Sequence, residues 1–322
     1  MPRLVAPGSV SVVERTLVIA LPDADIAGRL PPPPHGVRFI VWDLGDPDPG
    51  VTIDLLVLRY MIPPAELRGL DAVTARVVQS QTLGFDGVRE YLPSGMVYCN
   101  AVEVHEASTG ELALALMLAS QRGIGEAVAA QPRGEWAHAQ HPGLAGKTVL
   151  LIGVGGVGRE IEKRVAPFDA RLVRIARSAR TDGRGRVHGM DSLAALLPEA
   201  DIVVLAVPLA SDTRHLVDTE FLALLHPGAL VVNVARGGVV DTAALVDWLA
   251  AGRGRAALDV TDPEPLPADH PLWTLPGAII TPHLGGHTDA MTGRVDRVVL
   301  EQVRRLRAGA PPLNAVFGVP FP

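Results

Sequence analysis

The chain has 322 residues and a formal net charge of -6 at pH 7, so it lacks the basic excess with which proteins bind a nucleic-acid backbone. Hydrophobic residues make up 48%, but charges, prolines and glycines interrupt every run long enough to span a membrane. The N-terminus lacks the pattern of a secretory leader, and the single cysteine, Cys99, cannot form an internal disulfide. We therefore expect a cytoplasmic protein of two ordinary-sized domains, with neither nucleic acid nor membrane as a partner.

The first part of the chain alternates short apolar runs with segments long enough for helices or loops. This α/β pattern predicts strands at residues 17–21, 37–41, 55–58 and 76–80. The first fifteen residues show no such period, and we expect them to be loosely attached. Cys99 lies in a further strand-like run, where a lone cysteine is typical of a small buried hydrophobe rather than a redox thiol.

A change of pattern near Glu106 marks the first predicted domain boundary. Residues 108–122 predict a helix that is apolar on most of its faces and therefore deeply packed. An irregular arm follows at residues 131–144. Residues 294–307 are again helical, and a second boundary near residue 287 returns the end of the chain to the first domain. That domain is then discontinuous.

A glycine-rich motif lies between a predicted strand and a predicted helix. The strand at residues 148–152 runs directly into Gly153-Val-Gly-Gly-Val-Gly158. Gly153 permits a tight turn, Gly155 lets the backbone approach a pyrophosphate, and Gly158 allows close helix packing. The first amides of the helix then face the anion. This order of strand, glycine loop and helix predicts a dinucleotide site.

The end of the next predicted strand, residues 171–178, bears on which dinucleotide binds. NAD sites usually carry an Asp or Glu there, which accepts hydrogen bonds from the ribose hydroxyls. Here the residues are Ala176, Arg177 and Ser178. An arginine beside a hydroxyl suits a 2'-phosphate, and Arg180 can add a second charge. We therefore predict NADP as the preferred cofactor, with NAD as the alternative.

Three polar residues each follow an apolar run that predicts a buried parallel strand. They are Arg236, Glu264 and His283, and the runs before them span residues 229–235, 256–260 and 278–281. Ligands of open α/β sheets bind at the carboxyl ends of the strands, so we expect the three side chains to share one crevice. Together they offer a carboxylate anchor, an orienting acid and a proton donor, the set that reduction of a 2-keto acid requires. The ten histidines show no metal-ligand spacing, so we predict no metal site.

Further motifs follow one another in a defined order along the second half of the chain. They are Asp201-Ile-Val-Val-Leu-Ala-Val-Pro208, Thr213-Arg-His215, Asn233-Val-Ala-Arg-Gly-Gly-Val-Val-Asp241, Leu258-Asp-Val260, Pro263-Glu-Pro265 and Thr281-Pro-His-Leu-Gly-Gly286. In this order and spacing the chain closely resembles the D-isomer-specific 2-hydroxyacid dehydrogenase family, from residue 75 to the end. The N-terminal quarter is similar in pattern only.

The resemblance implies a role for each polar residue. Arg236 matches the arginine that pairs with the substrate carboxylate and carbonyl oxygen, and His283 matches the general acid and base. Glu264 matches the carboxylate that hydrogen-bonds the other imidazole nitrogen and fixes its tautomer. Asp259 matches a residue near the nicotinamide carboxamide. The further cofactor contacts that the resemblance implies are Gly156, Val157, Val207, Pro208, Thr213, Ala235, Gly285 and Gly286.

The resemblance also implies an α/β fold of two doubly wound parallel-sheet domains. The dinucleotide-binding domain, of Rossmann type, spans residues 109–287. The substrate domain, flavodoxin-like, combines residues 1–108 and 288–322. A homodimer is implied as well, built around the helix and arm at residues 112–136.

A loop in the first domain resembles the family loop whose backbone amides hold the substrate carboxylate. The amides belong to Thr82, Leu83 and Gly84. Leu83 stands where the family usually has a small residue, which leaves the size of the substrate pocket open. Gly110 replaces the usual Ala in the helix-opening segment, and we expect it to affect the hinge rather than the chemistry.

Several functions are compatible with these residues. Glyoxylate or hydroxypyruvate reduction comes first because an NADP preference suits a reductive direction, and another 2-keto acid is the next choice. Formate oxidation is disfavoured because that branch lacks an acid at the position of Glu264. Phosphoglycerate oxidation is disfavoured because we see no regulatory domain before the end at Pro322. A dinucleotide-sensing corepressor of the same fold keeps the triad, so only a substrate screen separates it from an enzyme.

Overall fold

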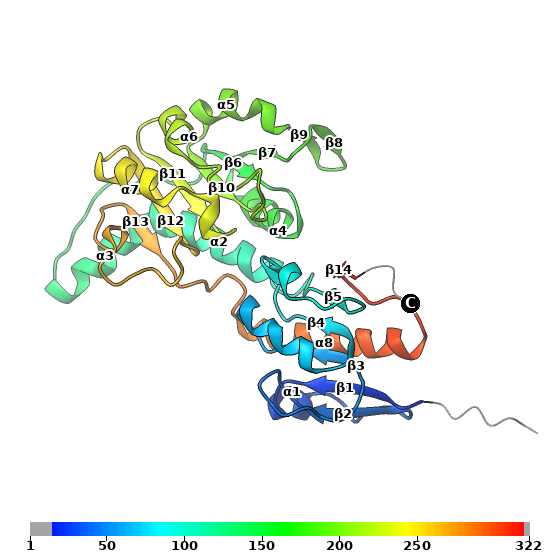
Figure 1. Ribbon diagram of the computed structural model, residues 1–322. Coiled ribbons are helices and arrows are strands. Elements are labelled where there is room, and N and C mark those ends of the chain that lie inside the picture. The colour runs from blue at the N-terminus through cyan, green and yellow to red at the C-terminus, as the bar shows by residue number, and fades with distance from the viewer. Residues whose placement is uncertain (1–14, 319–322) are drawn as a thin grey trace, which may run out of the picture. The chain divides into compact units, whose positions relative to one another are not determined.

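The computed structural model describes residues 15–318, which form two compact units (Figure 1). The first unit runs to Ala101 and resumes at Val295, and the second runs from Val102 to Arg294. We expected the first fifteen residues to be loosely attached. All of them except Arg15 lie outside the described range.

The boundary between the units is set by the start of the last helix, α8 (Asp289–Arg307). Hydrogen bonds join this start to residues around the beginning of α2 (Glu106–Gln121). Arg294 Nη1 donates to Val104 O at 2.9 Å, and the hydroxyls of Ser108 and Thr288 lie 2.9 Å apart. The first turn of α8 therefore belongs to the second unit, and the boundaries predicted at residues 108 and 287 fall inside that unit.

The first unit is built on a parallel sheet that an antiparallel strand extends at one edge. Its strands are β1 (Leu17–Leu21), β2 (Val37–Val41), β3 (Ile53–Val57), β4 (Ala75–Gln79), β5 (Val97–Cys99) and β14 (Ala315–Phe317). The order β2-β1-β3-β4-β5 is that of flavodoxin-like sheets, and β14 pairs antiparallel with β5. The helix α1 (Ala24–Arg29) follows β1. These strands confirm the four predicted ones, with ends shifted by at most two residues.

The core of the first unit explains its sequence pattern. Every residue of β3 is buried, as a central parallel strand requires, and buried Asp54 is paired with Arg15 at 3.0 Å and Arg76 at 3.3 Å. Cys99 is fully buried, and burial raises the pKa of its thiol to about 12. The prediction of a small buried hydrophobe at this position is confirmed.

The second unit contains a six-stranded parallel sheet. Its strands are β6 (Thr148–Ile152), β7 (Arg171–Ile175), β10 (Ile202–Leu205), β11 (Ala229–Asn233), β12 (Gly254–Leu258) and β13 (Ala278–Ile280). The sheet order is β7-β6-β10-β11-β12-β13, so the strand order reverses between β6 and β10. A parallel bridge between Ile175 and His188 attaches the hairpin of β8 (Arg180–Asp182) and β9 (Gly185–Val187) beyond β7. Open α/β sheets bind ligands at such a reversal point.

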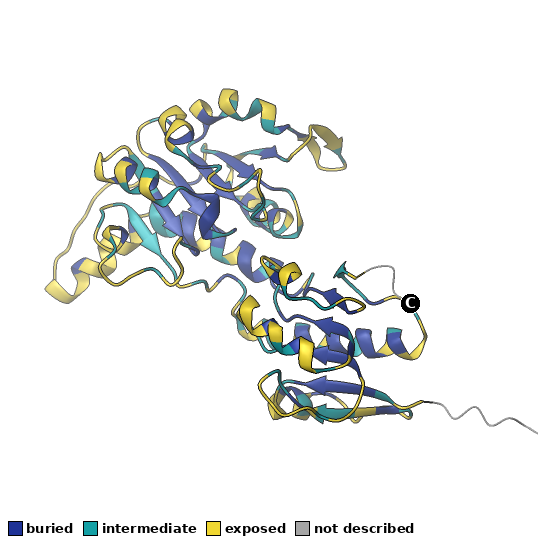
Figure 2. Ribbon diagram, in the orientation of Figure 1, coloured by how far each residue is buried: buried dark blue, intermediate teal, exposed yellow. Residues whose placement is uncertain are grey.

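Helices cover both faces of this sheet. They are α2 (Glu106–Gln121), α4 (Gly156–Val165), α5 (Leu193–Leu196), α6 (Thr219–Leu224) and α7 (Thr242–Ala250). The short helix α3 (Ile124–Ala130) follows α2 and leaves Ile124 and Val128 exposed. Side chains of α2 and α4 pack with Val149 and Leu151 on one face, whereas α6 and α7 pack with Leu150 and Ile152 on the other. The central strands β6, β10 and β11 are accordingly buried along almost their whole length in Figure 2. Burial on both faces is why they appear in the sequence as continuous apolar runs.

The close packing of α2 on α4 explains Gly110. A Cβ atom on this residue would lie 2.9 Å from the backbone carbon of Glu160, so an alanine does not fit without movement of a helix. Gly110 thus serves helix packing within the second unit. Among the described residues no single helix has the length and apolarity to cross a membrane, and one pair bent by 65°, Glu106–Gln121 with Ile124–Arg133, meets the length and composition criteria together.

Candidate active site

The glycine loop lies at the carboxyl end of β6, beside the reversal point of the second sheet. Gly153 has φ 105°, and a Cβ there would lie 2.3 Å from Ala206 O. At Gly158 a Cβ would lie 2.0 Å from the carbonyl oxygen of Gly153, whereas the space beside Gly155 is open. Helix α4 begins at Gly156, so its first amides face the loop. The loop therefore has the tight turn and the open backbone that a dinucleotide pyrophosphate requires, and the contacts of the individual glycines with it stay a prediction.

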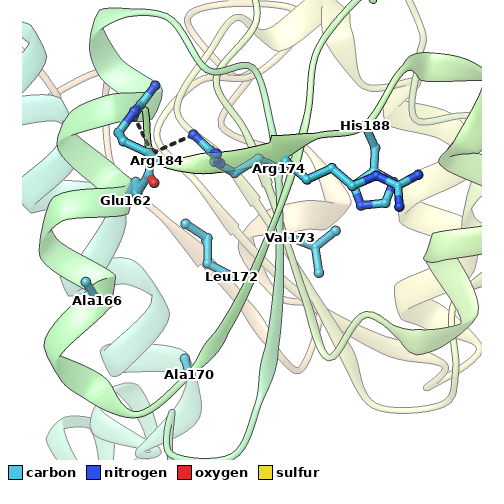
Figure 3. Close-up of a pocket in the computed structure, with 9 residues that line it drawn as sticks. Glu162, Ala166, Ala170, Leu172, Val173, Arg174, Arg184 and His188 are labelled. Carbon is cyan, nitrogen blue, oxygen red and sulfur yellow. Dashed lines mark hydrogen bonds and ion pairs between the residues drawn. The ribbon is translucent and has the colours of Figure 1, made fainter. Parts of the chain in front are cut away.

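Hydrogen bonds to His188 hold the end of β7 just before the residues that are predicted to contact a 2'-phosphate. His188 N donates to Arg174 O at 2.8 Å, and Ala176 N donates to His188 O at 3.0 Å. The buried guanidinium of Arg174 pairs with Asp182 at 3.1 Å and Glu162 at 3.6 Å. Figure 3 shows this corner, where a hollow of about 470 Å³ separates α4 and β7 from the hairpin. The hollow contains none of the predicted site residues, but its ion pairs hold the end of β7 in place.

Arg177 emerges from the end of β7 into solvent and meets an acid that the sequence analysis did not single out. Its side chain is 78% exposed, and Nη2 lies 3.0 Å from Asp212 Oδ2. Arg180 Nη1 donates to the carbonyl oxygen of Ser178 at 3.4 Å. The end of β7 thus carries no acid of its own, as predicted, yet one reaches it from the loop after β10. No local sequence signal connects residues 177 and 212.

The loop after β10 is a tight turn that the hydroxyl of Thr213 holds together. This hydroxyl donates to Pro208 O at 2.6 Å and accepts from Ala210 N at 2.8 Å. Val207 and Pro208, predicted cofactor contacts, therefore lie on an ordered segment beside the glycine loop. The same turn fixes the backbone position of Asp212.

Arg236 follows β11 in an extended conformation, with φ -147° and ψ 147°. Asn233, fully buried at the end of that strand, sets the turn, because its Nδ2 donates to Arg236 O at 2.9 Å and its Oδ1 accepts from Ala235 N at 3.0 Å. The guanidinium of Arg236 donates to Ala235 O at 2.7 Å. Asn233 therefore positions Arg236. It lies in the quoted motif of residues 233–241, but the sequence analysis did not predict this role for it.

Glu264 and His283 form the central pair of the site. His283 Nδ1 and Glu264 Oε1 are 2.6 Å apart, with the side chains 29% and 39% exposed. The hydrogen bond with His283 lowers the pKa of Glu264 against the opposing effect of burial, and the charges of His283 and Arg236 lower it further. The three predicted catalytic residues therefore belong to one electrostatic cluster.

Asp259 holds the loop that carries His283. Its buried carboxylate accepts from Leu284 N at 2.7 Å and Gly285 N at 2.8 Å, and from the hydroxyl of Thr281 at 2.6 Å. His283 itself has the left-handed φ of 54°, and its backbone N donates to Asp259 O at 2.8 Å. The resemblance placed Asp259 near the nicotinamide carboxamide, and the structure adds a task for it in shaping the histidine loop.

At Gly285 and Gly286, which follow His283, other side chains lie too close to the backbone for a Cβ atom to fit. A Cβ on Gly285 would lie 2.9 Å from Asp259 Oδ2, and one on Gly286 would lie 2.4 Å from His105 Nδ1. Both residues belong to the second unit, as do all the predicted cofactor residues. Among the described residues no group of His, Cys, Asp and Glu side chains could hold a metal ion.

The predicted substrate loop lies in the first unit and is internally hydrogen-bonded. Thr82 N donates to Ser80 Oγ at 3.0 Å, so this amide is already occupied. Asn100 Nδ2 donates to Leu83 O at 2.9 Å, and Thr82 Oγ1 donates to Gly84 O at 3.1 Å. Among the described residues no hydrogen bond occupies the amides of Leu83 and Gly84, so their role as donors to the substrate carboxylate stays a prediction.

Residues 114–285, more than half of the chain, match the family described as D-isomer specific 2-hydroxyacid dehydrogenase, NAD binding domain. The chain belongs to this family. The match confirms the resemblance on which the residue roles were based.

The curated relatives of this chain have different names. A glyoxylate reductase from Pyrococcus horikoshii is 34% identical over 256 residues, which are 75% of this chain and 76% of that protein. A D-3-phosphoglycerate dehydrogenase from Methanocaldococcus jannaschii is 36% identical over 254 residues, 75% of this chain and 47% of that protein. The alignment thus spans about half the length of the second relative.

A solved structure shares the fold of this chain. It is an NADPH-dependent glyoxylate/hydroxypyruvate reductase from Sinorhizobium meliloti in complex with NADP and malonate. The likeness has 25% identity and a TM-score of 0.75, and it covers 95% of this chain and 98% of that one. The prediction of an α/β fold with two parallel-sheet domains is confirmed.

Proposed function

We propose that this dehydrogenase reduces glyoxylate or hydroxypyruvate to the corresponding 2-hydroxy acid, with NADPH as the preferred hydride donor. The observation that carries the reaction type is the 2.6 Å contact between His283 and Glu264, in one cluster with Arg236. The names of the Pyrococcus and Sinorhizobium proteins support the choice of substrate.

Arg236 binds the substrate in this proposal. Its planar guanidinium presents parallel N–H donors that match a carboxylate and the neighbouring carbonyl oxygen. As the carbonyl carbon becomes tetrahedral, negative charge develops on that oxygen, and the arginine stabilises it. The amides of Leu83 and Gly84 are proposed as carboxylate donors from the family resemblance alone.

His283 supplies the proton. Its Nδ1 is engaged by Glu264, so Nε2 is the nitrogen left to face the substrate oxygen. The reduced nicotinamide supplies the hydride that reaches the carbonyl carbon. His283 Nε2 gives its proton to the carbonyl oxygen, which becomes the hydroxyl of the product. Because the imidazole is 29% exposed, solvent can restore the proton.

NADPH is proposed because Arg177, Ser178 and Arg180 present two cations and a hydroxyl between the end of β7 and the start of β8. A 2'-phosphate carries three acceptor oxygens and close to two negative charges, which these groups match. The β7 edge is anchored through Ala176, so the backbone of this segment is prepared for the ligand.

A homodimer is proposed as the working assembly. Apolar side chains of α3 and the arm after it are exposed, namely Ile124 at 51%, Val128 at 60% and Trp136 at 93%. A tryptophan with this exposure is typical of a surface that another chain covers.

A substrate screen tests the proposed reaction. Purified protein is mixed with NADPH or NADH and with glyoxylate, hydroxypyruvate, pyruvate or phosphohydroxypyruvate, and cofactor absorbance is followed. We expect the highest kcat/KM with glyoxylate or hydroxypyruvate and NADPH. Tight cofactor binding without turnover of any keto acid would instead identify a dinucleotide-sensing binding protein.

A further inference from the structure

The ion pair between Arg177 and Asp212 crosses the nucleotide crevice. Arg177 follows β7, and Asp212 lies on the loop after β10. In the sheet both strands are direct neighbours of β6, one on each side. A contact of 3.0 Å between the two side chains therefore passes over the carboxyl end of β6, where the glycine loop begins. Open α/β sheets bind dinucleotides at this place.

Both partners are positioned by their backbones. The turn around Asp212 is closed by Thr213, whose backbone N donates to Ala210 O at 3.1 Å and whose hydroxyl accepts from Ala210 N at 2.8 Å. The start of the Arg177 segment is held by the hydrogen bond from Ala176 to His188. The acid that is missing from the end of β7 is thus supplied across the crevice by the loop after β10, the strand on the other side of β6.

We propose that Asp212 is a specificity-determining residue that weakens the NADP preference of this site and keeps NAD usable. The proposal rests on the proposed function, since it takes Arg177 as the group that meets the 2'-phosphate. With NAD, the Asp212 carboxylate accepts a hydrogen bond from the ribose hydroxyl, as the acid at the end of β7 does in other NAD sites. With NADP, the same carboxylate faces a phosphate of its own sign and competes with it for Arg177.

The size of this effect follows from the exposure of the pair. Asp212 and Arg177 are 53% and 78% exposed, so water screens their attraction and the ion pair itself is weak. A phosphate that takes the place of Asp212 beside Arg177 therefore has to break only a weak ion pair. The repulsion between the carboxylate and the phosphate remains after the displacement, although water screens it.

The test uses isothermal titration of the full chain with NADP+ and NAD+. In Asp212→Asn the ratio of the NAD+ Kd to the NADP+ Kd should rise roughly three- to tenfold over that of the wild type, and added salt should shrink the rise. Asp212→Glu, which keeps the charge, should stay near the wild-type ratio. Asp247→Asn on the exposed side of α7 makes the same charge change outside the crevice and should not alter the ratio.

The outcomes separate this proposal from the proposed cofactor preference. If Arg177→Gln fails to weaken NADP+ binding, the assignment of the 2'-phosphate site is wrong. If Arg177→Gln weakens it but Asp212→Asn leaves the ratio unchanged, only the role of Asp212 is overturned. A lower ratio of the NAD+ Kd to the NADP+ Kd in Asp212→Asn would also overturn the role of Asp212. That result would mean that Asp212 orients Arg177 for the phosphate and favours NADP.

Discussion

Glu264 and His283 are joined by a contact of 2.6 Å between Oε1 and Nδ1, although they lie on separate loops after β12 and β13. The two strands are neighbours in the sheet, so parallel pairing brings both loops to the same edge. The contact orients the imidazole and leaves its second nitrogen for the substrate.

The pKa of Glu264 leads to a prediction about stability and pH. It is lowered from an ordinary value of 4.5, first by the hydrogen bond with His283. A carboxyl group with a lowered folded-state pKa stabilises the protein above its ordinary pKa, and this contribution is lost as the pH falls through the lowered value. We expect the difference in free energy of unfolding between wild type and Glu264→Gln to be present above pH 4.5 and to shrink as the pH falls below that value. Urea unfolding at a series of pH values measures it, and a difference that stays constant into strong acid would contradict the account.

Replacement of Arg236 by lysine tests the need for a planar fork. Lysine keeps the charge but cannot make two parallel hydrogen bonds, so kcat/KM for the keto acid should fall about 100-fold. The Kd for NADPH should not change. Arg186→Lys, at an exposed position of β9, is the matched control and should behave as the wild type. Steady-state kinetics of the two variants measure the effect. An unaltered kcat/KM in Arg236→Lys would show that the reaction does not need the guanidinium of Arg236.

Gly110 should tolerate no side chain without cost. An alanine Cβ would approach the backbone of α4 to 2.9 Å, and overpacking of this kind costs about 1–3 kcal/mol, which outweighs the gain in helix propensity. The same change at Gly28 in α1 has open space and should instead be neutral or stabilising. Urea midpoints of the two variants provide the comparison. Equal midpoints would show that α2 and α4 separate easily.

The proposed dimer makes a prediction about mass. Light scattering at micromolar concentration should give twice the chain mass of 33.9 kDa. Trp136→Ser should shift the population toward monomer, because Trp136 is the most exposed of the large apolar side chains. Val41→Ser, at an exposed apolar position of the first unit, should leave the mass unchanged. A monomeric wild type would refute the proposed assembly.

The strands and the glycine loop could be predicted because their causes are local. Continuous apolar runs follow from burial on both faces of a sheet, and Gly153 is required by a backbone contact next to its own strand. Arg236, Glu264 and His283 were found because each follows a strand, and the ends of parallel strands meet at one edge.

Other features depend on partners distant in sequence. Asp212 reaches Arg177 only because β7 and β10 flank the same strand. The amide of Thr82 is occupied by the hydroxyl of Ser80, a detail of loop geometry that no spacing reveals. The unit boundary at Arg294 follows from hydrogen bonds to Val104 rather than from helix periodicity.

The most direct test of the account compares wild type with His283→Gln in the reduction of glyoxylate by NADPH. Glutamine retains polarity and volume but cannot donate the proton, so kcat should fall about 100- to 10,000-fold. The Kd for NADPH should change little, and His35→Gln, an exposed histidine of the first unit, should match the wild type. A His283→Gln variant that keeps the wild-type kcat would contradict the assignment of His283 as the proton donor.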